Sequence, residues 1–202
     1  DEFIKPTSSM EGLGKLRPAF RKEGTVTAGN ASGMNDGAAA LILASEEAIQ
    51  KYQLPILTRI VDVVWTGVDP SEMGLGPVHA VAALLKKQAL TFENIDFWEI
   101  NEAFAGQVLA CLAAWQDPEY CKNQLGLTEI LGRVDQAKIN IDGGAVAMGH
   151  PVGASGARLV LHLAHILKRK QAHFGIATLC IGGGQGGALL LENSDKTKTG
   201  VL

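Results

Sequence analysis

The sequence predicts an α/β layered domain with a largely parallel sheet, because strand-like and helix-like segments alternate along its second half. Two joins support this alternation: Gly76-Pro77 precedes a helical pattern, and the glycine-rich run 182–187 connects two apolar, strand-like segments. The five predicted strands cover residues 58–64, 95–100, 137–141, 175–181 and 188–192, and the three predicted helices cover 78–89, 103–115 and 153–170.

The composition is that of a globular chain that can bury a substantial core. Of the 202 residues, 47% are hydrophobic and 24 are glycine, which suits one or two domains. The net charge of −3, with no basic run longer than residues 168–170, argues against a nucleic-acid partner. No apolar run approaches the roughly 20 residues that a membrane-spanning helix needs, so no membrane span is expected.

Cysteine usage bears on the cellular compartment. The three cysteines, none of them at Cys-x-x-Cys spacing, indicate a reducing environment without a disulfide framework. We therefore expect a cytoplasmic protein, with an organellar location of a longer parent protein left open. The chain opens at Asp1 without a targeting segment, which is typical of the interior of a longer protein.

Three stretches are less regular than the rest. Residues 24–33 are predicted to form a strand that leads into a turn of small residues. Residues 40–44 are an apolar run that fits either a buried strand or the start of a helix, and periodicity does not decide between them. Residues 116–134 are a polar insertion, and residues 195–202 are a polar tail.

The segment 143–158 is the first candidate for chemistry. It holds five glycines and the pair His150-Pro151, between a strand-like run and a helix-like run. Because Pro151 suits the first turn of a helix, His150 is expected at a helix N-terminus, where the dipole disfavours a positively charged imidazole. A neutral imidazole can accept a proton or donate a hydrogen bond to developing negative charge. The segment is therefore predicted to be an active-site turn.

Two phosphate-binding motifs are excluded by their context. The spacing Gly144-x4-Gly149 is that of a P-loop, but His150-Pro151 replaces the required Lys-Ser/Thr. The run 182–187 fits a dinucleotide fingerprint, but a strand-like segment follows it where the fingerprint needs a helix. Neither motif therefore predicts a nucleotide cofactor.

Two further candidates follow predicted strands. Asn101 comes directly after one strand and Cys180 ends another, and catalytic groups of α/β sheets gather at such carboxyl ends. Asn101 offers a donor and an acceptor for a water or an oxyanion, although an asparagine there equally fits a helix N-cap. Cys180 is by default a small buried hydrophobe, but with His150 it forms a pair that titrates within reach of neutral pH.

The other cysteines and histidines favour structural roles. Cys111 has the spacing of a helix core, and Cys121 lies in the polar insertion. His162 and His165 share a helix face with two arginines, which predicts a solvated stripe rather than a metal site. His79 and His173 have no companions and are expected to be structural or on the surface. No metal is expected.

Taken in order, these motifs resemble signatures of the thiolase family, which comprises acetyl-CoA acetyltransferases and 3-ketoacyl-CoA thiolases. The resemblance covers nearly the whole chain and rests on residues 27–33, 101–104, 144–158 and 180–186. It implies an α-β-α C-terminal domain with a mixed, largely parallel five-stranded sheet. The implied boundaries are 1–35 for the end of the CoA-covering loop domain, 36–56 for the end of the N-terminal domain, 57–194 for the C-terminal domain and 195–202 for a tail.

The resemblance also implies a mechanism. A nucleophilic cysteine, without a counterpart in this sequence, becomes acylated by an acyl-CoA, and His150 draws its proton. His150 also stabilises the thioester oxyanion with a water held by Asn101. Cys180 takes a proton from the α-carbon of a second acyl-CoA, or returns one during cleavage. The backbone N–H of Gly182 contributes to a second oxyanion hole.

Substrate contacts are implied as well. No cofactor is expected beyond the coenzyme A thioesters that serve as substrates. Asp142 departs from the family pattern by replacing an asparagine near the His150 turn. The residues expected near CoA or the acyl group are Ser32, Ala28, Met73, Ala103, Phe104 and Lys5.

The implied function is Claisen condensation or thiolytic cleavage of a 3-ketoacyl-CoA. We expect this chain to be the C-terminal portion of such an enzyme, inactive without the N-terminal half, and the full protein to be a homodimer or homotetramer. The alternative is a non-catalytic, CoA-binding scaffold of the same fold. A ketoacyl synthase fits less well, since such enzymes use two histidines where this chain has His150 and Cys180.

Overall fold

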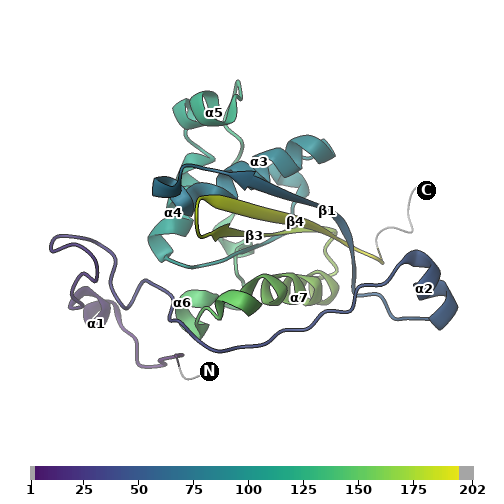
Figure 1. Ribbon diagram of the computed structural model, residues 1–202, viewed down its shortest axis with the longest axis horizontal. Helices are drawn as coiled ribbons and strands as arrows, with labels where there is room; N and C mark the ends of the chain where they lie inside the picture. Colours follow the sequence, from purple (N-terminus) through teal and green to yellow (C-terminus); the bar gives the residue numbers. More distant parts are fainter. Residues whose placement is uncertain (1–2, 196–202) are drawn as a thin grey trace.

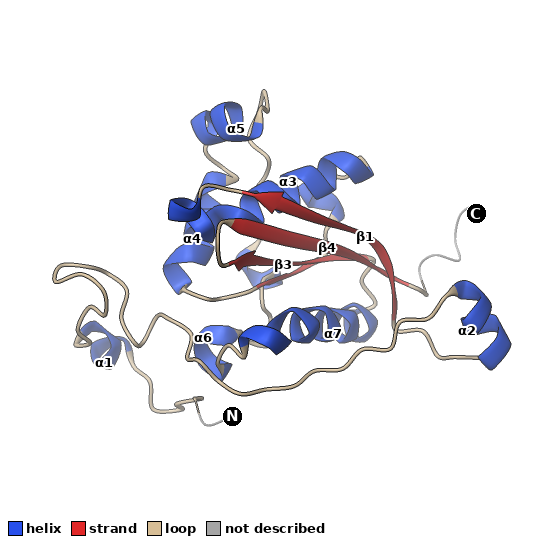
Figure 2. Ribbon diagram, in the orientation of Figure 1, coloured by secondary structure: helices blue, strands red, loops and turns tan. Residues whose placement is uncertain are grey.

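The computed structural model of the chain describes residues 3–195 and places its secondary structure around one mixed sheet (Figures 1 and 2). The predicted tail 195–202 therefore lies outside the described residues except for Asp195. The elements are α1 (Met10–Gly14), α2 (Glu46–Tyr52), β1 (Thr58–Gly67), η1 (Pro70–Leu75), α3 (Gly76–Gln88), η2 (Phe92–Asn94), β2 (Phe97–Ile100), α4 (Ala105–Ala114), α5 (Pro118–Leu125), η3 (Gln136–Lys138), α6 (Ala145–Met148), α7 (Val152–Lys170), β3 (Phe174–Ile181) and β4 (Gln185–Asn193).

The sheet has four strands in the order β1-β4-β3-β2. β2 runs parallel to β3, whereas β4 is antiparallel to both of its neighbours. The predicted mixed α/β layering is confirmed, but the prediction of five strands in a largely parallel sheet is wrong. β3 and β4 are joined by the tight turn at residues 182–184, and a turn that short can only produce an antiparallel pair.

The missing strand is the one predicted at residues 137–141. Ile139 forms a single parallel bridge with Trp98, so the segment lies along the edge of β2 without pairing further. Asn140 has a φ of 45°, which breaks the extended path. Its side-chain amide instead bonds the backbone N–H and C=O of Ile100, at 2.8 and 2.9 Å. A side chain thus takes the place of the next ladder rungs.

Helices cover the two faces of the sheet. Figure 1 shows α3 and α4 on one side and α7 on the other. The core on the α3 side combines apolar residues of α3, α4, β2 and β3, and a second cluster joins α7 to β3 and β4. The order of layers is therefore α-β-α, as predicted.

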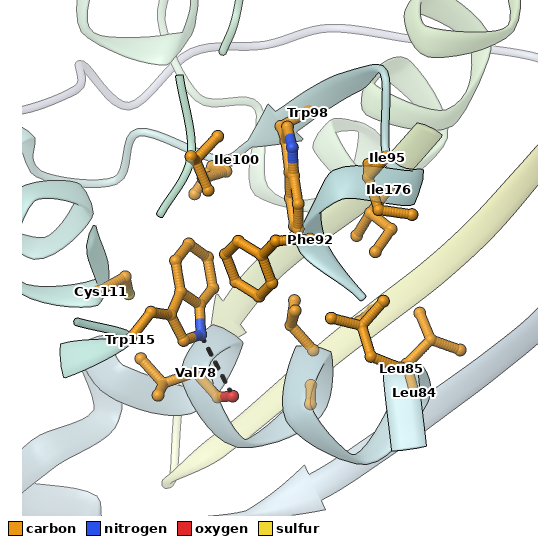
Figure 3. Packing of buried hydrophobic residues seen from close by; sticks show 14 of the residues in the cluster. Val78, Leu84, Leu85, Phe92, Ile95, Trp98, Ile100, Cys111, Trp115 and Ile176 are labelled. Carbon is orange, nitrogen blue, oxygen red and sulfur yellow. Dashed lines mark hydrogen bonds between the residues drawn. The ribbon is translucent and has the colours of Figure 1, made fainter. Parts of the chain in front are cut away.

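Three aromatic residues in mutual contact form the centre of the larger core, with their rings tilted or edge-to-face (Figure 3). The ring of Phe92 lies 4.9 Å from that of Trp98 and 5.3 Å from that of Trp115, measured between centroids. Trp115 is fully buried and its indole N–H donates to the carbonyl of Val78 at 3.4 Å. Buried indoles usually find such a partner, and here the bond also ties α4 to the first turns of α3.

The first 56 residues lie largely outside this core. The strand predicted within residues 24–33 is not formed, since Thr27 and Ala31 take part only in isolated bridges. The apolar run 40–44 is neither a buried strand nor a helix: it is extended, and Ile42 is 93% exposed. The helix begins later, at Glu46, where the side chain of Ser45 accepts a hydrogen bond from Ala48 N at 3.2 Å.

An apolar groove of ≈ 310 Å³ lies between this extended run and the sheet. Leu41 and Leu43 line it from one side, and Ile60, Val63 and Trp65 of β1 from the other. Trp65 is 64% exposed and Leu43 75% exposed. Contiguous apolar surface of this kind is uncommon on a monomer and is typical of interaction surfaces and ligand-binding grooves.

The two tryptophans with contrasting burial give a direct stability test. Trp115→Ala removes a fully buried side chain and should lower the free energy of unfolding by about 3–5 kcal/mol. Trp65→Ala, at the exposed site, should lower it by about 1 kcal/mol or less. Urea unfolding followed by circular dichroism measures both. Equal losses would contradict the assignment of the core.

The groove predicts self-association of the 202-residue chain. Leu43→Lys places a charge in the apolar surface and should lower the associated fraction measured by light scattering. Leu109→Lys is the matched control, because Leu109 is 61% exposed on α4, away from the groove. A monodisperse monomer for the unmodified chain would contradict this prediction.

Candidate active site

The candidate site begins at the carboxyl end of β2. The backbone N–H of Asn101 continues the parallel pairing by donating to Thr178 O of β3 at 3.0 Å. Its side chain is fully buried, and Nδ2 lies 3.3 Å from Nε2 of His150. The other side-chain atom, Oδ1, is buried without a hydrogen-bond partner among the described residues. A buried amide oxygen in that state is suited to accept a hydrogen bond from a ligand or water.

Hydrogen bonds around His150 determine which ring nitrogen carries the proton. Ser155 Oγ donates its only proton to Pro151 O at 3.1 Å, so it accepts from His150 Nδ1 at 2.6 Å. These contacts favour the tautomer with its proton on Nδ1. Nε2 keeps its lone pair and accepts from Asn101 Nδ2. The arrangement holds a neutral imidazole with its basic nitrogen toward Asn101.

The surroundings of His150 also favour the neutral form. Burial lowers the pKa of the imidazole below its usual value, and the positive charge of Arg158 lowers it further. Arg158 lies two turns into α7, and its Nε and Nη2 are buried without a described partner. Because both effects lower the pKa of His150, they favour the neutral imidazole, which is able to accept a proton.

Cys180 occupies the carboxyl end of β3, next to the strand that carries Asn101. It pairs with Gly186 of β4 and is 8% exposed. Burial raises the pKa of its thiol, so the protonated form dominates at neutral pH. Within residues 3–195, no hydrogen bond joins this thiol to His150 or Asn101. The structure thus brings Asn101 and His150 into contact and places Cys180 on the adjacent strand end.

A segment from the first part of the chain connects the two loops. Ser32 donates to Ala103 O through both its N–H and its hydroxyl, each at 3.0 Å. His150 N donates to Gly33 O at 2.8 Å. Phe104 forms a bridge with Ala31 and an edge-to-face contact with Phe20 at 6.3 Å. Ser32, Ala103 and Phe104 are therefore gathered beside the Asn101–His150 pair.

The remaining predicted residues lie around this group without a recorded bond to it. Gly182 is exposed in the β3–β4 turn, two residues after Cys180. Met73 is half-buried in η1, and Ala28 and Lys5 are exposed. Among the described residues, no hydrogen bond or ring contact joins any of these four to Asn101 or His150.

Sequence reasoning missed several residues that shape the site. Ser155 follows Pro151 by four positions, which is the spacing that brings its hydroxyl onto Pro151 O in a helix. Glu102 lies within the motif 101–104, but no role was assigned to it from the sequence. It accepts hydrogen bonds from Asn140 Nδ2 at 2.7 Å and from Val146 N at 3.1 Å. No signal in the sequence joins positions 40 residues apart.

The solvated stripe predicted on α7 is wrong for His162. Its Nδ1 lies 2.9 Å from Glu99 Oε1, and its Nε2 lies 3.0 Å from Asp142 Oδ2. Glu99 is fully buried, and its carboxylate, acting with that of Asp142, raises the pKa of His162. Asp142 also pairs with Arg169. The departure at Asp142 therefore affects His162, and no contact recorded for the described residues joins it to His150.

Two general findings bear on function. Within residues 3–195, no group of three His, Cys, Asp or Glu side chains is arranged to hold a metal ion. No helix in the same part of the chain combines the length and apolar character that crossing a membrane requires.

The fold and the site define an α/β domain with a histidine–asparagine pair at the carboxyl edge of its sheet. Family comparison makes the class specific. Residues 54–193 match the model "Thiolase, C-terminal domain", and residues 1–47 match "Thiolase, N-terminal domain". The chain belongs to the thiolase family.

Individual relatives agree with this assignment. The mitochondrial 3-ketoacyl-CoA thiolase of Bos taurus is 46% identical over 194 residues, covering 96% of this chain and 45% of the relative. A crystal structure of the Bacillus anthracis acetyl-CoA acetyltransferase matches with a TM-score of 0.83 and 45% identity. A human mitochondrial 3-ketoacyl-CoA thiolase in complex with CoA matches with a TM-score of 0.79 and 40% identity. Both structures cover 96% of this chain, which spans 45% of theirs.

The charge of Arg158 gives a test of the electrostatics at His150. Arg158→Gln removes the cation and should raise the pKa of His150 toward 6.5, without restoring it fully because the ring remains buried. Lys170→Gln removes the same charge at the far end of α7 and should leave that pKa unchanged. Titration of the imidazole followed by NMR measures both. An unchanged pKa in Arg158→Gln would contradict the role of Arg158.

Proposed function

We propose that this chain supplies part of the active site of a thiolase that acts on acyl-CoA thioesters. The reaction is Claisen condensation, or thiolytic cleavage of a 3-ketoacyl-CoA. The contact between Asn101 and a neutral His150 carries the proposal, because it provides a base beside a donor for negative charge. The names of the bovine and Bacillus anthracis relatives support the substrate class.

His150 acts first in this scheme. Its Nε2 takes the proton of a nucleophilic cysteine, whose thiolate attacks the thioester carbon and forms an acyl-enzyme while CoA leaves. Ser155 accepts from Nδ1, so the lone pair that receives the cysteine's proton lies on Nε2, the nitrogen that faces Asn101. Burial and Arg158 favour the neutral starting form.

Cys180 carries the second proton transfer. In condensation its thiolate takes a proton from the α-carbon of the second acyl-CoA. The carbanion attacks the carbonyl carbon of the acyl-enzyme, the C–S bond to the nucleophilic cysteine breaks, and that cysteine leaves as a thiolate. In cleavage the protonated thiol returns that proton to the leaving carbon. The raised pKa of Cys180 suits the donating role directly, and it also makes the thiolate a stronger base once it forms.

Two groups of donors stabilise the negative oxygens. His150, whose Nε2 is a donor once it has taken the proton of the nucleophilic cysteine, and a water held by the unpartnered Oδ1 of Asn101 serve the thioester of the incoming substrate. The backbone N–H of Gly182, exposed in the β3–β4 turn, serves the acyl-enzyme. One such donor typically lowers the barrier by about 3–4 kcal/mol.

The CoA arm passes the segment that connects the two loops. Ser32 and Ala28 lie on this segment, and Ala103 and Phe104 adjoin it. Met73 contributes to the acyl path and Lys5 to the phosphate end. The human relative solved with CoA supports CoA as the ligand.

The nucleophile is supplied from outside the 202 residues. Of the three cysteines, Cys111 and Cys121 are fully buried, and burial raises the pKa of Cys111 to about 12. Neither is suited to attack a thioester. We therefore propose that the chain alone is inactive and works with an N-terminal half in a homodimer or homotetramer. A cytoplasmic location stays a prediction.

The experiment uses a full-length protein that contains this chain. Cys180→Ala should lower condensation by at least about 10²-fold while acyl-enzyme still forms, because the first half-reaction does not need this thiol. Intact-protein mass spectrometry detects the acyl-enzyme, and CoA release measures condensation. Cys121→Ser is the control, since the buried thiol of Cys121 donates to the backbone carbonyls of Ala114 and Trp115.

Three outcomes decide the question. Condensation that survives in Cys180→Ala without any acylated protein would overturn the role of Cys180. Turnover by the purified 202-residue chain would overturn its inactivity. An unmodified full-length protein that binds CoA but forms no acyl-enzyme would instead be the non-catalytic scaffold.

A further inference from the structure

We propose that Glu102 is a positioning residue that holds the Asn101 loop and the His150 turn at a fixed separation. Its catalytic consequence rests on the proposed function, whereas its effect on the geometry of His150 does not.

The carboxylate of Glu102 joins two segments that are far apart in sequence. Oε1 accepts from Asn140 Nδ2 at 2.7 Å, and Oε2 accepts from Val146 N at 3.1 Å. Both partners are donors, so the site requires two acceptor atoms. An ionised carboxylate supplies them, whereas an amide would turn its NH2 group toward one of the donors.

The neighbouring backbone is shaped around this carboxylate. A Cβ added to Gly144 would lie within 2.5 Å of both carboxylate oxygens, closer than real contacts allow. Gly144 has φ −148° and ψ −163°, values open to any residue, so it is not required by backbone conformation. The glycine instead leaves the room that Glu102 fills.

Asn140 completes the connection. Its amide bonds the N–H and C=O of Ile100 as well as Glu102, so one side chain contacts the residues on both sides of Asn101. The second partner of Glu102, Val146, belongs to α6, and only three residues separate it from His150. One partner of Glu102, Asn140, is thus hydrogen-bonded to the residue before Asn101, and the other partner, Val146, lies four residues before His150.

The distance that depends on this connection is the 3.3 Å contact between Asn101 Nδ2 and His150 Nε2. It is already long for a hydrogen bond, so a small outward movement of either loop breaks it. The bond stabilises the neutral imidazole, and its loss should raise the pKa of His150. Glu102 therefore acts on the base through position, without touching a reacting atom.

The test is a double-mutant cycle in the full-length protein. Glu102→Ala removes the carboxylate, and Gly144→Ala displaces it. Each should raise the pKa of His150, as measured by NMR titration, and lower kcat by about 10–10²-fold with a smaller change in KM. The double variant should match Glu102→Ala alone, because the added methyl group then enters the space that the carboxylate has left.

Two further variants separate positioning from general stability. Asp117→Ala is the matched control, since the carboxylate of Asp117 also accepts two hydrogen bonds, here from the backbone N–H groups of Glu119 and Tyr120, but lies at the start of α5. It should leave the pKa of His150 and kcat unchanged. Glu102→Gln keeps the side-chain volume and should behave like Glu102→Ala while retaining a thermal unfolding midpoint near that of the unmodified protein.

The outcomes are distinguishable. An unchanged pKa of His150 in folded Glu102→Gln, or additive effects of Glu102→Ala and Gly144→Ala, would overturn the positioning role. A full-length protein without acyl transfer would overturn the proposed function, and the pKa measurement would still decide whether Glu102 positions His150.

Discussion

The parallel pairing of β2 with β3 is the constraint on which the candidate site depends. Ile100 lies opposite Thr178, and the next N–H, that of Asn101, still bonds to β3. Because both strands run in the same direction, their carboxyl ends meet at one edge, where Asn101 follows β2 directly and Cys180 is the second-last residue of β3. The antiparallel pairs of β4 then build the rest of the sheet without changing this edge.

Much of this arrangement was predictable from local signals. Apolar spacing gave α3, α4 and α7 within two residues of their observed ends, and the glycine-rich run after Cys180 gave the turn between the last two strands. The positions of Asn101 and Cys180 at strand ends were predicted from the same local signals, because each lies where an apolar, strand-like run ends. These signals depend on neighbours in sequence, which is why they were readable.

The errors concern contacts between distant segments. The run 137–141 has the pattern of a strand. Only the position of β2 explains why Asn140 instead bonds to Ile100 through its side chain. His162 was interpreted from its neighbours on one helix, whereas its partners are Glu99, 63 residues away, and Asp142. The run 40–44 has the composition of a buried strand, yet within residues 3–195 it meets no strand to pair with. Composition indicates which secondary structures a segment is able to form, and the neighbouring segments in the fold determine which one it adopts.

A close approach of two backbones limits how the Cys180 edge can evolve. A side chain at Gly76, in the first turn of α3, would overlap the backbone of residues 185–186, and one at Gly186 would overlap the backbone of Gly76. Gly186 is the residue that pairs with Cys180. A substitution at either glycine would have to separate the helix from the hairpin, and because the obstacle is main chain on both sides, no compensating change in a side chain can restore the fit. Variation at either glycine is therefore strongly restricted. A single substitution at one of them would displace Cys180, and a second substitution in a nearby side chain would not restore its position.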